Sequence, residues 1–220
     1  MPGTFYADRT EAGKALAQAL MRELSSTSLG RPLVLAIPRG GVVVAKEVAE
    51  ALDADLDVVV PRKLGAEGNP EYAIGAVMQD GTTYLNPEAL RVTGATERYI
   101  DSVKKKEMAE ASRRLLAYRG RRKEPELSGR VVVVVDDGIA TGATMIAALR
   151  WARSKGASML IAAAPVGPPS TVEELKDEAD MVVCPMTPEP FYAIGQFYQH
   201  FDQVTDKEVE KMLTGPIAKG

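Results

Sequence analysis

The chain has 220 residues, of which 45% are hydrophobic and 26% are charged, and its formal net charge is −3. This composition is ordinary for one globular domain with a smaller appended element, and it gives no overall attraction to nucleic acid. The single cysteine excludes a disulfide framework or a cysteine zinc site within a monomer. The N-terminus shows no leader pattern and no apolar run approaches membrane-spanning length, so we expect a cytoplasmic protein.

The first predicted element is a helix over residues 9–24. Asp8 and Glu11 have the spacing of a capping box, which satisfies backbone N–H groups at a helix start. Apolar residues then recur at helical spacing, which indicates one buried face. These residues are Ala12, Leu16, Ala19, Leu20 and Leu24.

A strand over residues 33–37 and a helix over residues 42–52 follow. The turn between them contains Arg39, Gly40 and Gly41. Adjacent glycines permit backbone conformations that are closed to other residues, so their amides can approach an anion. Arg39 can add several hydrogen-bond donors in a fixed geometry.

The next strand, over residues 56–60, leads to a pair of cations, Arg62 and Lys63. The alternative interpretation is an ordinary solvated Arg-Lys pair. Residues 73–77 and 82–85, on either side of a short turn with Asp-Gly, predict a hairpin.

Residues 86–128 interrupt the alternation of strands and helices, and we interpret them as a helical insertion or a small hood above the sheet edge. Residues 96–125 form a long polar helical stretch with an incomplete apolar face. Acidic side chains partly offset its basic ones, which favours a solvated surface; binding of RNA or phosphate is the alternative. The basic residues are Lys104, Lys105, Lys106, Arg113, Arg114, Arg119, Arg121, Arg122 and Lys123.

The most informative segment is residues 131–145. Five consecutive valines suit a strand buried on both faces, as in parallel sheets, and Asp136 and Asp137 stand at its carboxyl end. A small-residue loop and an apolar helix over residues 145–155 come next. Glycines and a helix N-terminus favour anion binding, and the absence of a lysine argues for a monophosphate attached to a ribose whose hydroxyls the acids can reach. The loop consists of Gly138, Ile139, Ala140, Thr141, Gly142, Ala143 and Thr144.

Further strands are predicted over residues 158–164 and 181–184. Together with the earlier ones they predict an α/β fold with a central, mostly parallel sheet and helices on both faces. Cys184 is interpreted as a buried small hydrophobe and His200 as a structural or surface residue. A late aromatic cluster is interpreted as core, with stacking on a flat base as the alternative. The cluster comprises Phe191, Tyr192, Phe197 and Tyr198.

The hydrophobic strand, the two acids and the loop with Thr-Gly resemble the signature of type I phosphoribosyltransferases. A resemblance over nearly the whole chain to uncharacterised bacterial and archaeal members rests on four segments. They read PRGGVVVA, RKLGAEGNPEYAIGAV, DDGIATGATM and YAIGQFY.

The resemblance implies a Rossmann-like core and a substrate, phosphoribosyl pyrophosphate (PRPP). Residues 138–144 would hold its 5′-phosphate, and Asp136 and Asp137 would hold its ribose and, through water, Mg²⁺. Arg39, Gly40 and Gly41 would form the pyrophosphate loop. Arg62 and Lys63 would neutralise the leaving group, and residues 65–72 would contribute to a mobile segment that closes over the reaction.

The implied activity is transfer of the phosphoribosyl group to a nitrogen acceptor such as a nucleobase, with release of pyrophosphate, by a homodimer in nucleotide metabolism. Members that act on hypoxanthine or guanine carry an aspartate where this chain has Ala140, which argues against a 6-oxopurine acceptor. Glu189 is a candidate acid on the acceptor side. The alternatives are a non-catalytic PRPP or nucleotide sensor, which could bind RNA through residues 96–125, and an enzyme for another phosphorylated ribose. Nucleic acid is the less favoured partner.

Overall fold

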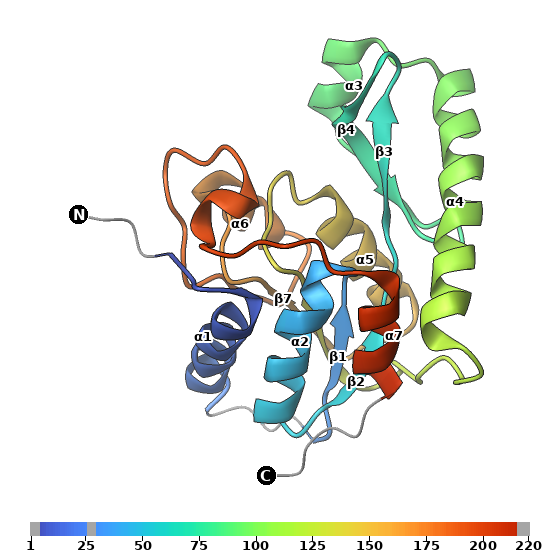
Figure 1. Cartoon of the computed structure of the whole chain (residues 1–220). Helices are drawn as coiled ribbons and strands as arrows, with labels where there is room; N and C mark the ends of the chain where they lie inside the picture. Colours follow the sequence, from blue (N-terminus) through green and yellow to red (C-terminus); the bar gives the residue numbers. More distant parts are fainter. Residues whose placement is uncertain (1–4, 26–29, 215–220) are drawn as a thin grey trace.

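The computed structural model describes residues 5–25 and 30–214. Its centre is a five-stranded parallel sheet with the strand order β2-β1-β6-β7-β8. A three-stranded antiparallel sheet, in the order β3-β4-β5, lies beside it (Figure 1). The predicted fold class, an α/β protein with a mostly parallel sheet, is confirmed.

All five strands predicted for the central sheet are present, and their ends lie close to the predicted ones. The middle strand, β6, is the run of valines, and it is buried along its whole length, since strands pair with both of its edges and helices cover both of its faces. The strands are β1 (Leu33–Ala36), β2 (Asp55–Val58), β6 (Val131–Val135), β7 (Met159–Ala163) and β8 (Met181–Val183).

Helices cover both faces of this sheet, and the side chains of successive valines in β6 pack alternately against one face and the other. Val131, Val133 and Val135 pack in the core that contains α1 (Arg9–Glu23), α2 (Gly40–Ala51) and α7 (Asp206–Thr214). Val132 and Val134 pack in the opposite core, with α5 (Ala143–Ser154) and α6 (Pro169–Leu175). Side chains alternate across a strand, so an uninterrupted apolar strand needs cover on both sides.

The start of α1 confirms the predicted cap and corrects one of its bonds. The Asp8 carboxylate accepts a hydrogen bond from the backbone N–H of Glu11 at 2.9 Å. The Glu11 carboxylate accepts from the backbone N–H of Ala7, one residue before the N-cap where a capping box would place it. Leu16 and Leu20 are fully buried, as the helical spacing predicts.

The smaller sheet and two helices form a second unit with a hydrophobic cluster of its own, which includes Leu64, Ile74 and Ala89. The predicted hairpin is confirmed, since β4 pairs antiparallel with β5. In Figure 1 this unit projects beyond the main sheet, and α4 runs along its side. The elements are β3 (Arg62–Ala66), β4 (Asn69–Val77), β5 (Thr83–Leu85), α3 (Pro87–Thr93) and α4 (Glu97–Arg119).

The C-terminal end of α4 returns to the main sheet. Tyr118 is buried in the core beside α2 and α7, and Arg119 forms an ion pair with Asp57 of β2 at 3.2 Å. Helices α3 and α4 thus lie within the segment 86–128 and pack on strands that precede it. Their role as a hood stays a prediction. Among the described helices, none combines the length and apolar character needed to cross a lipid bilayer.

Candidate active site

The carboxyl ends of the central strands lie at one level. Ala36 of β1 is in register with Val58 of β2 and with Val135 of β6, and Val135 is in register with Ala163 of β7. The chain leaves β1 toward one edge of the sheet and β6 toward the other, so the strand order switches between these two strands. In open α/β sheets the crevice at such a switch point is where ligands bind.

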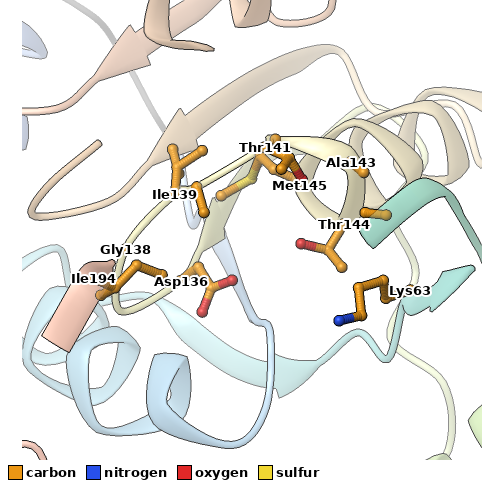
Figure 2. A pocket seen from close by; sticks show the side chains of 12 residues that line it. Lys63, Asp136, Gly138, Ile139, Thr141, Ala143, Thr144, Met145 and Ile194 are labelled. Carbon is orange, nitrogen blue, oxygen red and sulfur yellow. The ribbon is translucent and has the colours of Figure 1, made fainter. Parts of the chain in front are cut away.

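A pocket of about 150 Å³ lies at this edge (Figure 2). Lys63 comes from β3, Asp136 follows β6, and Ile194 comes from the short 3-10 helix η1 (Ile194–Phe197). Ala73 of β4 completes the lining on the side of the smaller sheet. The loop after β6 and the first turn of α5 supply the rest, namely Gly138, Ile139, Ala140, Thr141, Gly142, Ala143, Thr144 and Met145.

The loop is held in place from its outer side. The backbone N–H of Ile139 donates to the carbonyl oxygen of Val166 at 2.8 Å, and the Thr171 hydroxyl donates to the carbonyl oxygen of Ala140 at 2.9 Å. Gly142 is the N-cap of α5 and has a left-handed backbone with φ of 72°. Because Gly142 has no side chain to cap the helix, the first amides of α5 stay available for an anion.

Asp136 is the acid that lines the pocket, and Figure 2 shows its carboxylate with Lys63 and Thr144 on the opposite side. The backbone N–H of Asp137 donates to Asp136 Oδ1 at 2.8 Å. Burial and then the neighbouring charge of Asp137 raise the pKa of Asp136 well above its usual range. A ligand that donates hydrogen bonds here would stabilise the ionised form.

Asp137 points away from the pocket. Its Oδ2 lies 2.7 Å from Nε of Arg9, and its backbone carbonyl accepts a hydrogen bond from the Tyr198 hydroxyl. Burial is the main cause that raises the pKa of Tyr198, and the charge of Asp137 adds to it. The two acids, adjacent in the chain, therefore have different surroundings.

Gly40 and Gly41 pack directly against the two acids. A Cβ atom on Gly40 would lie 1.8 Å from Asp137 Oδ2, and one on Gly41 would lie 2.9 Å from the Asp136 Cα. Neither glycine has a backbone φ in the left-handed region. The structure thus corrects the sequence interpretation: these positions need glycine for a close approach to the acids, and not for an unusual backbone conformation.

Arg39, at the N-cap of α2, is held by the C-terminal helix. Its Nη1 lies 3.8 Å from Oδ1 of Asp206, the first residue of α7. The Tyr118 hydroxyl from α4 donates to the same Asp206 oxygen at 2.6 Å. Arg39 is not among the residues that line the pocket.

The structure separates the predicted cation pair. Lys63 lines the pocket, and its Nζ lies 2.9 Å from Oε2 of Glu71, a side chain that is 92% exposed. Arg62 Nε lies 2.9 Å from Oε2 of Glu107 on α4. Consecutive residues of a strand point to opposite faces, which explains why only one of the two reaches the pocket.

The late aromatic cluster divides between core and surface. Phe197 and Tyr198 are buried, and Phe191 stacks on Phe197 with ring centroids 5.1 Å apart. Tyr192 is 83% exposed. His200 is exposed, in agreement with its interpretation as a surface residue.

Arg9 and Asp206 contact two predicted site residues, Asp137 and Arg39, and the sequence interpretation missed both contacts. Each stands in the first turn of a helix, one at the start of the chain and one near its end. Their partners, Asp137 and Arg39, are more than a hundred residues away along the chain. No local pattern signals such a contact, because charged residues are common at exposed helix ends.

Cys184 is only partly buried, where the sequence interpretation expected a buried side chain. Burial raises the pKa of its thiol to about 12, and the thiol donates to the carbonyl oxygen of Met186. Because the thiolate is the nucleophile, we expect the native protein to resist iodoacetamide at pH 8 and to react readily in denaturant. Mass spectrometry of the alkylated protein measures this. Native labelling at the rate of free cysteine would contradict it.

Comparisons with known proteins identify the chain. The model of the family described as "Phosphoribosyl transferase domain" matches residues 7–199. Mycobacterium tuberculosis H37Rv has a protein named "Putative phosphoribosyl transferase Rv0571c", which is 45% identical over 208 residues, or 94% of this chain and 46% of that protein. The chain thus spans less than half the length of this relative.

Two solved structures are similar to this chain, one in sequence and fold and one in fold alone. TT1426 from Thermus thermophilus is 44% identical, with a TM-score of 0.78 over 95% of this chain and 97% of that one. AQ2163 from Aquifex aeolicus is 12% identical, with a TM-score of 0.50 over 85% of this chain and 78% of that one, and shares the fold alone. The family match over most of the chain and the close relatives confirm the predicted resemblance: this chain belongs to the phosphoribosyl transferase domain family.

Proposed function

We propose that this chain transfers the 5-phosphoribosyl group of PRPP to a nitrogen acceptor, such as a nucleobase, and releases pyrophosphate. The observation that carries the proposal is the pocket at the switch point of the sheet. It combines an amide-rich loop at a helix N-terminus, an acid and a lysine within about 150 Å³. These groups suit a phosphate, ribose hydroxyls and a second phosphate group, respectively.

The 5′-phosphate would bind to residues 138–144. The first-turn amides of α5 and the hydroxyls of Thr141 and Thr144 would donate to its oxygens. Asp136, which lines the pocket, would accept hydrogen bonds from the ribose hydroxyls, and Asp137 would support it from the next position. Charged acceptors strengthen such hydrogen bonds.

The pyrophosphate would lie toward Arg39, Gly40, Gly41, Arg62 and Lys63. Lys63 is the cation that can change partner most easily, because its ion pair with Glu71 is exposed. An exposed pair of this kind contributes only about 0–1 kcal/mol, so a diphosphate can displace the carboxylate at little cost. Arg62 and Arg39 would have to leave Glu107 and Asp206, or act from their present places.

Mg²⁺ belongs to this proposal as the ion that accompanies a diphosphate. It prefers carboxylate and phosphate oxygens and keeps several waters, so it needs only one or two protein carboxylates. Among the described residues, no group of three or more potential metal ligands converges on one point. Asp136 fits an ion held largely by its substrate, directly or through water, whereas Asp137, which is paired with Arg9, would act through water. When bound, the ion would offset negative charge on the leaving pyrophosphate.

The proposed reaction is a substitution at C1′ of the ribose. The bond from C1′ to the pyrophosphate oxygen breaks, and its electron pair leaves with pyrophosphate. The lone pair of the acceptor nitrogen forms the new bond to C1′, and the acceptor releases its proton to solvent. The chain contributes by orientation and by charge: Asp136 fixes the ribose, the loop fixes the 5′-phosphate, and Lys63 stabilises the leaving group.

The acceptor is a nucleobase in this proposal, and Ala140 argues against a 6-oxopurine. Ala140 is exposed beside the pocket and has no side-chain group that could exchange a proton with a purine. Glu189 and Tyr192 are candidates for the acceptor side. The homodimer and the cytoplasmic location are parts of the same proposal, and light scattering after size-exclusion chromatography tests the first of them.

An assay of pyrophosphate release with PRPP, Mg²⁺ and a panel of free bases tests the proposal. Lys63→Ala should lower kcat/KM by about 10²-fold, because it removes a charge that stabilises the transition state. Lys46→Ala is the matched control: Lys46 is a lysine of similar exposure that is also paired with a glutamate, Glu50, but it lies on α2 outside the pocket. Arg62→Ala should have a smaller effect than Lys63→Ala, since Arg62 is directed to α4.

Two outcomes would contradict the proposed transferase activity. Saturable PRPP binding without turnover on any acceptor would favour a non-catalytic PRPP sensor. The absence of PRPP binding would exclude both the transferase and the sensor. Of the basic residues that an RNA-binding role would use, Arg113 and Arg114 both donate to Glu110, at 2.7 and 2.6 Å. The hydrogen bonds from Arg113 and then Arg114 lower the pKa of Glu110 to about 2.

A further inference from the structure

Arg9 contacts Asp137, which is next to the pocket residue Asp136, and two residues near the end of the chain. Its Nε donates to Asp137 Oδ2 at 2.7 Å, and its Nη1 donates to the backbone carbonyl oxygen of Asp202 at 2.8 Å. The centre of its guanidinium lies 3.9 Å from the centroid of the Phe201 ring. The side chains of Arg9 and Asp137 are only 11% and 13% exposed.

We propose that Arg9 is a positioning residue that fixes Asp137 behind the ribose site and ties the C-terminal segment, residues 198–202, to the same point. This inference rests on the proposed function, because it assigns Arg9 a share in binding the donor. Arg9 does not line the pocket, so its effect on a ligand would pass through Asp137.

The packing around Asp137 explains why its carboxylate needs a fixed partner. Gly40, at the start of the pyrophosphate loop, approaches so closely that a Cβ there would meet the Asp137 carboxylate and the Arg9 guanidinium at 1.8 and 2.6 Å. A buried carboxylate that loses its cation is strongly disfavoured and rotates or draws in water. Either response would disturb Gly40 and the neighbouring Asp136.

The C-terminal segment holds the guanidinium from the other side. The ring of Phe201 and the Asp202 carbonyl restrict its rotation, and the Tyr198 hydroxyl donates to the backbone carbonyl of Asp137. Residues 198–202 therefore contact both Asp137 and its partner. A lysine at position 9 could supply the charge but not the planar set of donors that joins Asp137 to Asp202.

Arg9 also changes the charge that a donor ligand meets. Two adjacent carboxylates would repel the phosphates of PRPP, and the guanidinium offsets one of these charges at 2.7 Å. The pair can then present one net negative charge near the ribose hydroxyls.

A double-mutant cycle in the 220-residue chain tests the inference. We would measure the affinity for ribose 5-phosphate by calorimetry for the wild type, Arg9→Gln, Asp137→Asn and the double variant. Each single variant should bind about 10-fold more weakly, and the double variant should bind no more weakly than Asp137→Asn alone, because residues that act through one contact are not additive. Arg9→Lys should fall between wild type and Arg9→Gln.

Arg31→Gln is the control for loss of an arginine outside the site, although the Arg31 side chain is 75% exposed and that of Arg9 only 11%. Arg31 forms an equally short ion pair, 2.8 Å from Asp55, next to the amino end of the sheet, and its loss should leave the affinity unchanged. Melting temperatures without ligand separate stability from binding, since a merely structural Arg9 would lower the melting temperature without coupling to Asp137 in affinity.

Three results would overturn the inference. Arg9→Gln could bind ribose 5-phosphate as wild type does, or the two effects could be additive; either would leave the proposed function standing. If the wild type bound neither PRPP nor ribose 5-phosphate, PRPP would be excluded as the donor. The proposed role of Arg9 would then be excluded as well.

Discussion

Asp136→Asn should lower pyrophosphate release from PRPP by at least about 10²-fold, the largest effect that we expect from a single side chain. Asparagine keeps an oxygen that can accept the hydrogen bond from the Asp137 backbone, which Asp136 Oδ1 accepts at 2.8 Å. It removes the negative charge next to the ribose. The substitution should therefore reduce the binding and turnover of the donor and leave the fold unchanged.

The same substitution should stabilise the protein in the absence of ligand. Burial and the charge of Asp137 raise the pKa of Asp136, so the folded state holds this proton more tightly than the unfolded state does. Ionised Asp136 therefore costs stability, and this cost is greatest above the raised pKa of the folded state. It shrinks as the pH falls through that value and disappears below the unfolded pKa of about 4.

Thermal unfolding at several pH values measures this effect. Asp136→Asn should melt above wild type at neutral pH, and the two curves should converge toward pH 4. Asp177→Asn, at an exposed turn between α6 and β8, is the control and should change neither turnover nor the pH dependence of stability. A variant that keeps more than a tenth of wild-type turnover would exclude Asp136 from the donor site.

Gly40→Ala should weaken binding of PRPP through a steric clash in the candidate active site. Its Cβ would lie 1.8 Å from Asp137 Oδ2 and 2.6 Å from Arg9 Nε, so either the carboxylate or the start of α2 must move. Overpacking of this kind typically costs about 1–3 kcal/mol of stability. Because the displaced atoms belong to Asp137 and to the turn of Arg39, Gly40 and Gly41, which we propose to bind pyrophosphate, we expect PRPP affinity to fall by about 10-fold or more.

A second glycine substitution distinguishes the effect of backbone strain from the effect of a steric clash with the acids. Gly94, the C-cap of α3, has a φ of 63°, and a Cβ there would meet no atom within 4 Å. Gly94→Ala should cost about 1 kcal/mol through its left-handed backbone and leave PRPP affinity unchanged. Urea unfolding and calorimetry compare the two variants. Equal loss of PRPP affinity in both would show that Gly40 acts through general stability and not through the acids.

Local sequence patterns predicted the framework of the site because they report on short-range physics. The valine run of β6 needs cover on both faces, and its acids must then appear at the carboxyl edge of a parallel sheet. The small residues that follow predicted the loop that now lines most of the pocket. For the same reason the capping pattern at Asp8 located the start of α1.

The same patterns could not predict which of two neighbouring residues reaches the site. Only Lys63 of the two cations lines the pocket, because successive side chains of β3 point to opposite faces. Only Asp136 of the two acids lines it. The reason for Gly40 also lay outside the local sequence, since it depends on a carboxylate almost a hundred residues later.

By itself, the sequence determined the α/β architecture, the family resemblance and the loop that lines most of the pocket. These features depend on hydrophobic periodicity and on residues adjacent in the chain. Only the tertiary structure decided that Arg9 holds Asp137, that Asp206 holds Arg39 and that Lys63, not Arg62, lines the pocket. Such contacts join side chains that are far apart along the chain, and their partners are fixed only when the sheet and its helices have packed.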